Sequence, residues 1–270
     1  MPNARANDIQ LFYQRLGAGS PTIVFIHGLV MDNLSSWWYT VANAAAGVAD
    51  VVCYDLRGHG LSERPESGYS VADSVDDLVG LLDTLAIDHP VHLVGNSYGG
   101  VVALATAVSH PERVAGMILV EVHAAVESLR PRSRRQLAEG LDLAGLVLDD
   151  QDVNQWLENL GGRKLNRMAA SAKALIYGTT LVGDLRESPA FKEVDLQGVS
   201  CPVKMVFGEH SDILDRAELL SRVLPNADLR VIEGADHSVL MGATSEVRAL
   251  VLDWVRAHRP ELQETEWRAS

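Results

Sequence analysis

The segment Val91-His92-Leu93-Val94-Gly95-Asn96-Ser97-Tyr98-Gly99-Gly100 decides the fold of this chain. Its first four residues are rich in β-formers and lead directly into Gly-x-Ser-x-Gly, and an apolar helical pattern follows over residues 101–108. A serine at a sharp turn from a strand into a helix is typical of a reactive hydroxyl held by a strained backbone. Gly95 and Gly99 leave the turn free of side chains that would block it. Ser97 is therefore the candidate nucleophile.

The composition describes a globular protein that can bury a large core: of 270 residues, 47% are hydrophobic and 22% are charged. A net charge of −13, from 23 Lys plus Arg against 36 Asp plus Glu, argues against nucleic acid or an anionic membrane as a partner. Residues 1–16 lack the apolar core of a signal peptide, and no apolar run is long enough to span a bilayer. We interpret Cys53 and Cys201 as reduced thiols and expect a cytoplasmic protein.

Strand and helix patterns alternate along most of the chain. Apolar runs without alternation, such as Thr22–Ile26, indicate strands that are covered on both faces. The predicted strands are 9–13, 22–26, 51–54, 91–94, 114–120, 203–207 and 229–233, and the predicted helices are 37–46, 71–85, 101–108, 217–223 and 246–259. Short connections between them predict an α/β fold, a mostly parallel, doubly wound sheet flanked by helices.

The alternation stops between residues 124 and 198. This segment has helical patterns but no strand, and it is too long for a simple connection. We therefore predict one core domain formed by residues 1–123 and 199–270, with residues 124–198 inserted into it as a helical unit.

Taken together, the motifs resemble the α/β-hydrolase fold family over nearly the whole chain. They are His27-Gly28, Asp55-x-Arg57-Gly58-x-Gly60-x-Ser62, Gly95-Asn96-Ser97-Tyr98-Gly99-Gly100, the turn Gly208–Asp212, and Gly234-Ala235-Asp236-His237. The resemblance implies that the helical insertion is a lid over the catalytic pocket. It also implies a catalytic triad in the chain order serine, acid, histidine.

His237 is the predicted general base. A serine hydroxyl is a poor nucleophile until a base takes its proton. Among nine histidines, His237 follows the last predicted strand, in a loop at the carboxyl edge of the sheet, where ligands of open α/β sheets bind. The same edge carries Ser97, and the position also matches the family's pattern.

The acid of the triad has three candidates. Asp212 is the first choice, because the family usually places its acid in the turn after the strand 203–207. The turn Gly208–Asp212 is, however, one residue longer than the commoner pattern, so Glu209 competes with Asp212. Glu121 is the alternative from another loop, after the strand 114–120, where some relatives carry their acid.

The oxyanion of an acyl-transfer reaction needs preorganised donors. By resemblance these are the backbone amides of Leu29 and Tyr98. Asp55 and Arg57 resemble the family's structural turn, and we expect an ion-pair or capping network there. Ser97 argues against the dehalogenases and epoxide hydrolases of this fold, which carry aspartate at this point. No motif for a metal or a nucleotide is present, so we expect no cofactor.

The predicted function is that of a serine hydrolase that cleaves a carboxylic ester, or a related lactone or thioester, through an acyl-enzyme on Ser97. We expect Val30, Met31, Trp37, Trp156 and Tyr177 to line the pocket for a small-molecule acyl substrate. Arginines cluster at positions 130, 132, 134 and 135. We interpret this cluster as a solvated helix face; the alternative is a docking site for an acidic acyl carrier protein.

Two other functions stay open on this fold. Asn96 before Ser97 resembles the carbon–carbon bond hydrolases that act on ring-fission products, although the Gly-rich early loop typical of them is missing. Some relatives are small-molecule receptors with a slow or vestigial triad. Turnover of short esters distinguishes an enzyme from a receptor.

Overall fold

The computed structural model describes residues 2–129, 131–149 and 162–259. Within these ranges eight strands form a single sheet in the order β1-β2-β4-β3-β5-β6-β7-β8. The strands are β1 (Asn3–Ala6), β2 (Ile9–Gly17), β3 (Thr22–Ile26), β4 (Asp50–Tyr54), β5 (Val91–Asn96), β6 (Val114–Val120), β7 (Val203–Gly208) and β8 (Ala227–Ile232). β2 pairs antiparallel with β1 and β4, and every other pairing is parallel. This confirms the predicted α/β class.

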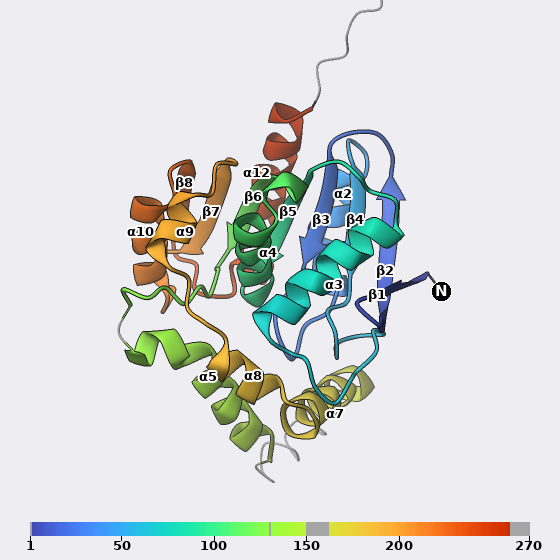
Figure 1. Cartoon of the computed structure of the whole chain (residues 1–270), viewed down its shortest axis with the longest axis vertical. Helices are drawn as coiled ribbons and strands as arrows, with labels where there is room; N and C mark the ends of the chain where they lie inside the picture. The colour runs from blue at the N-terminus through green and yellow to red at the C-terminus, as the bar shows by residue number, and fades with distance from the viewer. Residues whose placement is uncertain (1, 130, 150–161, 260–270) are drawn as a thin grey trace, which may run out of the picture.

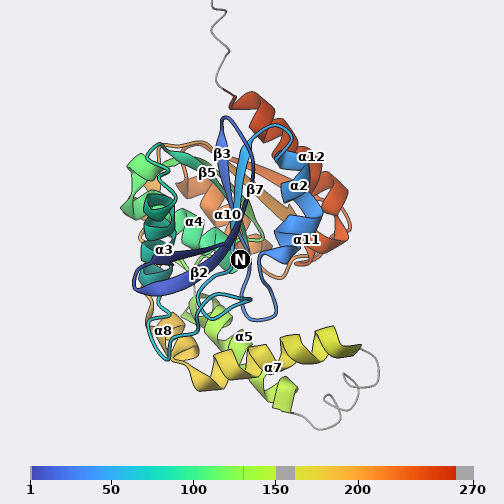
Figure 2. The same cartoon turned by 90° about the vertical axis from the view of Figure 1, so that its right-hand side faces the viewer.

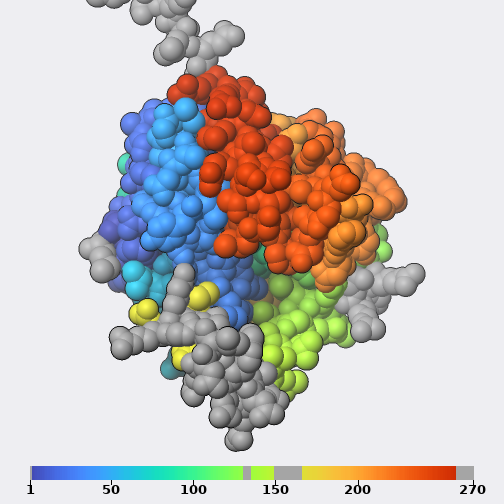
Figure 3. All heavy atoms as spheres, turned by 180° about the vertical axis from the view of Figure 1, so that it is seen from behind, coloured from blue at the N-terminus to red at the C-terminus, as the bar shows by residue number. Residues whose placement is uncertain are grey.

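Helices cover both faces of the sheet (Figure 2). One face carries α3 (Val71–Thr84), α4 (Tyr98–Ser109) and α10 (Leu214–Val223), which share an apolar core with strand side chains. The other face carries α1 (Ser35–Trp37), η1 (Trp38–Ala42), α2 (Asn43–Ala45), α11 (Val239–Gly242) and α12 (Thr244–Ala257) around a second core. Seen from behind, α12 (red) lies against the N-terminal segments (blue) (Figure 3).

The apolar runs explain the centre of the sheet. All residues of β3 and β4 are buried, as strands between two helical layers must be. Only β1 lacked a sequence signal, because Asn3-Ala4-Arg5-Ala6 has no run of β-formers and exists as a strand through its pairing with β2. The predicted helix over residues 37–46 is present, but its middle, η1, is a π-helical turn.

The described part of the segment between β6 and β7 is helical, as the pattern predicts. It contains α5 (Pro131–Asp149), α7 (Gly162–Gly178), α8 (Leu181–Glu187) and α9 (Glu193–Gln197). Outside this segment, the short 3₁₀ turn η2 (Pro111–Arg113) connects α4 to β6. α5 packs on α7 and α8, and all three gather at the end of the sheet to which β3 runs (Figures 1 and 2). These helices therefore stand over the carboxyl ends of the parallel strands.

Two further expectations concern the chain as a whole. Across the described ranges, no helix has both the length and the apolar character needed to cross a bilayer. Cys53 is buried in β4 and Cys201 is half-buried before β7, and both are free thiols. Burial raises the pKa of the Cys53 thiol far above its ordinary value, so this group is an inert part of the core.

Candidate active site

Ser97 lies in the strained turn that the sequence predicts. It links β5 directly to α4 with φ 52° and ψ −113°, a conformation that side chains other than glycine rarely adopt. A Cβ on Gly95 would overlap the carbonyl of Gly99, and a Cβ on Gly99 would overlap the carbonyl of Ile26. The two glycines therefore permit the close approach of β3, β5 and α4 that exposes Ser97 at the end of the sheet.

Several residues with strained backbone conformations lie in the loops next to this serine. Only six non-glycine residues of the described chain have positive φ angles, and three of them are Ser97, Glu121 (φ 49°) and Val30 (φ 68°). These three follow β5, β6 and β3, the neighbouring central strands. Such conformations cost about 1–3 kcal/mol each and cluster where geometry serves a function. The strain thus marks one site formed by three loops.

Glu121 holds His237. The Nδ1 atom of His237 donates to Oε2 of Glu121 at 2.9 Å, and the glutamate side chain is fully buried. The same carboxylate accepts hydrogen bonds from Gly208 N and Ser211 Oγ, both at 2.6 Å. Three donors therefore fix a buried carboxylate, and that carboxylate leaves the Nε2 atom of His237 as the basic nitrogen.

The pKa of His237 is raised above its ordinary value of 6.5, chiefly by the hydrogen bond to Glu121 and in spite of partial burial. The charges of Glu121, Asp212 and Asp236 add to this effect. A carboxylate that stabilises the charged imidazole is the electrostatic role of a triad acid. The arrangement can accept a proton at Nε2 and keep it.

Asp212, the first choice for the acid, does not hydrogen-bond His237 in the structure. Its side chain is exposed, and its Oδ2 accepts from Gln136 Nε2 at 3.2 Å. The extra residue in the turn Gly208–Asp212 explains the difference, because Ser211 points inward to Glu121 and Asp212 points outward. The alternative acid, Glu121, occupies the place beside His237 that was assigned to Asp212.

Glu209, the third candidate, supports the loop that carries His237. Its Oε2 accepts from Gly234 N at 2.9 Å, and the neighbouring His210 N donates to Ala235 O at 2.8 Å. A Cβ on Gly208 would overlap the carbonyls of Ala235 and Asp236. The turns after β7 and β8 are therefore packed directly on one another, which fixes the position of His237.

The loop after β6 connects the turn of Ser97 to the residue that binds His237. Ser97 N donates to Val120 O at 2.8 Å, and the next residue, Glu121, binds His237. In the part of the chain that the structure describes, no hydrogen bond joins Ser97 to His237 itself. Such bonds are often long without substrate and tighten when it binds.

The loop after β3 carries the predicted oxyanion donor Leu29. Gly28 N donates to Asp32 Oδ2 and Val30 N donates to His59 Nε2, each at 2.8 Å. Among the described residues no acceptor takes the N–H of Leu29 or that of Tyr98 at the start of α4. A Cβ on Gly28 would lie 3.6 Å from Cβ of Ser97, so the loop passes beside the nucleophile.

His59 is a residue that the motif analysis did not assign. Its Nδ1 donates to Arg57 O at 2.8 Å, so its Nε2 is free to accept from Val30 N, and burial lowers its pKa to about 3. A neutral imidazole thus holds Val30 in its strained conformation. Its only sequence signal was its place in Asp55-x-Arg57-Gly58-His59-Gly60, next to the predicted structural turn.

The predicted pocket residues separate into different environments. Trp37 does not line a pocket: it is fully buried, packs on Phe25 with ring centroids 5.1 Å apart, and donates to Ile26 O, because its helix turns this face to the core. Val30 packs against apolar residues of the insertion. Met31 is 39% exposed and Tyr177 is 55% exposed. Trp156 lies outside the described residues.

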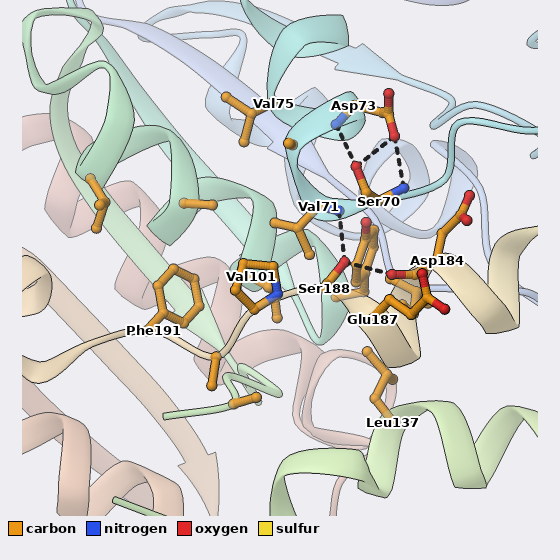
Figure 4. A pocket seen from close by; sticks show the side chains of 18 of the residues that line it. Ser70, Val71, Asp73, Val75, Val101, Leu137, Asp184, Glu187, Ser188 and Phe191 are labelled. Atoms are coloured by element: carbon orange, nitrogen blue, oxygen red, sulfur yellow. Dashed lines mark hydrogen bonds between the residues drawn. The ribbon is translucent and has the colours of Figure 1, made fainter. Parts of the chain in front are cut away.

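A cavity of about 950 Å³ lies between α3, α4 and the insertion (Figure 4). Its apolar walls include Val71, Val101, Leu137 and Phe191. Ser97 and His237 do not line it, but Tyr98 and His123, which follow Ser97 and Glu121 closely in the chain, do. The cavity therefore shares residues with the loops that carry Ser97 and Glu121, and its size is that of a small-molecule site.

No group of three or more His, Cys, Asp or Glu side chains within the described ranges could hold a metal ion. Of the clustered arginines, Arg135 has an exposed side chain and lies at the cavity, whereas the side chains of the other three are outside the description.

Comparison with known proteins agrees with this geometry. The family model of the alpha/beta hydrolase fold matches residues 21–144. A Mycobacterium tuberculosis protein of unassigned function is 39% identical over 83% of this chain and 72% of its own length. The 2-(acetamidomethylene)succinate hydrolase of Mesorhizobium japonicum is 29% identical over 86% of each chain. An N-acyl homoserine lactone degrading enzyme of known structure superposes with a TM-score of 0.72 at 25% identity, over 94% of this chain and 100% of its own.

The chain therefore belongs to the α/β-hydrolase fold family. The proteins similar in sequence include hydrolases of 2-(acetamidomethylene)succinate and of 2-hydroxymuconate semialdehyde and an enzyme that degrades N-acyl homoserine lactones, which supports hydrolysis as the class of reaction and small molecules as the class of substrate.

Proposed function

We propose that this protein is a serine hydrolase with Ser97 as nucleophile, His237 as general base and Glu121 as the acid. The observation that carries the proposal is the hydrogen bond between His237 and the buried carboxylate of Glu121, at the sheet edge where Ser97 stands in a strained turn. A chain without catalytic use for this arrangement has no reason to retain a buried carboxylate and three strained loops around one hydroxyl.

The proposed reaction is acyl transfer to water. Ser97 Oγ attacks the carbonyl carbon while His237 Nε2 takes the hydroxyl proton, and the oxyanion accepts hydrogen bonds from Leu29 N and Tyr98 N. His237 then delivers the proton to the leaving group, whose bond to the carbonyl carbon breaks. Water, activated by the same imidazole, hydrolyses the acyl-enzyme and restores Ser97. Each proposed step uses a side chain or an amide of the loops after β3, β5, β6 and β8.

The proposed substrate is a carboxylic ester, lactone or thioester of small size, and the helical insertion is the lid over it. The insertion stands over the carboxyl ends of the strands, and Val30 of the oxyanion loop packs on its residues. A cytoplasmic location is part of this proposal. So is an acyl carrier protein as donor of a thioester, which the exposed Arg135 at the cavity would contact.

The direct test is labelling with a fluorophosphonate, which reacts with an activated serine. We expect one label per chain and turnover of short 4-nitrophenyl esters, with both lost in Ser97→Ala. Ser221→Ala is a matched control, because Ser221 lies in α10, outside the cavity lining, and its hydroxyl donates to Ala217 O. Tight binding of esters without label or turnover would show a receptor and contradict the proposal.

A second function rests on Asn96 and on relatives. A 2-hydroxymuconate semialdehyde hydrolase of a Pseudomonas strain is 42% identical over 107 residues, which is 38% of this chain. By resemblance to the carbon–carbon bond hydrolases of this fold, Ser97 would then act on a ketone of a ring-fission product. Parallel assays with a ring-fission diketone and with 4-nitrophenyl butyrate separate the two functions, and a kcat/KM larger for the diketone would favour this second one.

A further inference from the structure

A second histidine stands beside the proposed catalytic pair. The rings of His123 and His237 are nearly perpendicular, at 82°, with centroids 6.4 Å apart. His123 lies two residues beyond Glu121 and lines the 950 Å³ cavity together with Tyr98. It therefore occupies the boundary between the site of bond cleavage and the space available to a substrate.

Arg216 fixes the proton on the His123 ring. Its guanidinium donates to His123 Nδ1 at 3.0 Å, to Ala124 O at 3.3 Å and to Gln136 Oε1 at 2.7 Å, and the arginine is 1% exposed. Because a guanidinium can only donate, Nδ1 must be the acceptor and the single ring proton sits on Nε2. The clamp also joins α10 to the loop after β6 and to α5, which makes the ring position rigid.

Burial, reinforced by the charge of Arg216, lowers the pKa of His123 to about 3, so the ring is neutral in the working range of a hydrolase. Its Nε2–H has no hydrogen-bond acceptor among the described residues. A fixed donor that borders a cavity, backed by a buried positive charge, is complementary to an oxygen atom, and more so to a negatively charged one.

We propose that His123, oriented by Arg216, is the specificity residue of this hydrolase and donates from Nε2 to an oxygen on the acyl half of the substrate. The proposal rests on the proposed function and narrows its substrate to acyl groups with a keto or carboxylate oxygen a few bonds from the scissile carbonyl.

The assignment to the acyl half follows from exposure. His237, which must protonate the leaving group, has 40% of its side chain exposed, so the leaving group departs on the solvent side. His123 lies on the inner side, toward the walls formed by Val101, Leu137 and Phe191. The part of the substrate that stays on Ser97 therefore extends past His123 into the cavity.

The test compares two esters of the same shape, 4-nitrophenyl 4-oxopentanoate and 4-nitrophenyl 4-methylpentanoate. One hydrogen bond of about 1–1.5 kcal/mol corresponds to roughly a tenfold preference in kcat/KM for the oxo ester in the wild type. In His123→Phe we expect the ratio to fall to about one, through a higher KM for the oxo ester, while the methyl ester changes little. His123→Asn, which keeps an N–H donor, is expected to restore part of the preference.

A ratio near one in the wild type, or a high ratio that survives in His123→Phe, would overturn the proposal. The rate of fluorophosphonate labelling of Ser97 reports separately whether each variant is folded and catalytically competent. A binding measurement keeps the two proposals apart: calorimetry on Ser97→Ala with 4-oxopentanoate and 4-methylpentanoate needs no turnover. Tighter binding of the oxo acid that is lost on His123→Phe supports the site even if ester hydrolysis fails, and equal binding contradicts it.

Discussion

His237 Nδ1 donates to Glu121 Oε2 at 2.9 Å, across 116 residues of chain, while Asp212 points to Gln136. The imidazole of this site is thus held from the end of β6 and not from the end of β7. Both loops open at the same sheet edge, so either can present a carboxylate to the histidine. Burial distinguishes them, since Glu121 is enclosed and Asp212 is exposed.

The first prediction separates the two acids. Glu121→Gln should lower kcat by about 10³- to 10⁴-fold, because an amide can hold the imidazole but cannot stabilise its charge. Asp212→Asn is the matched control and should stay within a few-fold of the wild type, since among the described residues its carboxylate accepts a hydrogen bond from Gln136 alone and its charge is a minor cause of the raised pKa of His237. Steady-state kinetics with a 4-nitrophenyl ester measures both. A larger loss of kcat in Asp212→Asn than in Glu121→Gln would indicate that Asp212, in the turn after β7, is the acid.

The second prediction concerns pH. The base works in its neutral form, so kcat/KM rises as the pH passes upward through the pKa of His237, which is raised above 6.5 mainly by Glu121. Glu121→Gln removes the largest cause of this shift and leaves the opposing effect of burial. We therefore expect the acidic limb of the profile to move to lower pH. Asp212→Asn should move it less in the same direction, and an unmoved limb in Glu121→Gln would contradict the assignment.

The sequence predicted the sheet and the strained turn at Ser97 because both depend on local patterns. Unbroken apolar runs require strands that are covered on both faces, and Gly95 and Gly99 are needed by the turn at Ser97 itself. The acid could not be chosen locally, because only the inward position of Ser211 in the longer turn shows that Asp212 faces outward. The prediction that Trp37 lines the pocket was wrong because the sequence pattern does not distinguish an apolar pocket residue from a core residue next to a loop.

The third prediction tests the turn around Ser97. Gly99→Ala should lower the free energy of unfolding by about 3 kcal/mol or more, because the new Cβ overlaps backbone carbonyls of β3 and its loop. Gly140→Ala is the opposite case: this glycine lies in α5 with no atom within 4 Å of the added Cβ, so helix propensity should raise stability by about 0.5–1 kcal/mol. Urea denaturation measures both, and equal effects would contradict the steric argument.

The fourth prediction concerns the predicted structural turn. Arg57 and Asp77 form a buried ion pair at 2.5 Å, with side chains 6% and 1% exposed. Asp77→Asn leaves the guanidinium buried without its countercharge and should cost about 3–5 kcal/mol. Asp253→Asn breaks the exposed pair of Asp253 with Arg256 and should change stability by no more than about 0.5 kcal/mol. Thermal unfolding distinguishes them, and a small effect of Asp77→Asn would show that the first pair is dispensable.

The last prediction concerns the oxyanion loop. His59 accepts a hydrogen bond from Val30 N at 2.8 Å and so holds Val30 at φ 68°, next to the amide of Leu29, for which the described residues provide no acceptor. In His59→Phe the Val30 amide loses its acceptor, the loop relaxes, and the Leu29 donor moves away from the developing oxyanion. We expect kcat to fall by about 10- to 100-fold with a smaller change in KM, because this contact matters most in the transition state.

His59→Gln, whose side-chain carbonyl can accept from Val30 N, is expected to recover much of the loss. His92→Phe is the control for the loss of a buried neutral histidine. His92 accepts a hydrogen bond from Trp254 Nε1, and this bond does not involve the loop after β3. It should affect stability and leave the kcat of the folded enzyme unchanged. If His59→Phe keeps the wild-type kcat, then the loop holds its shape without this histidine and the strain at Val30 has another cause.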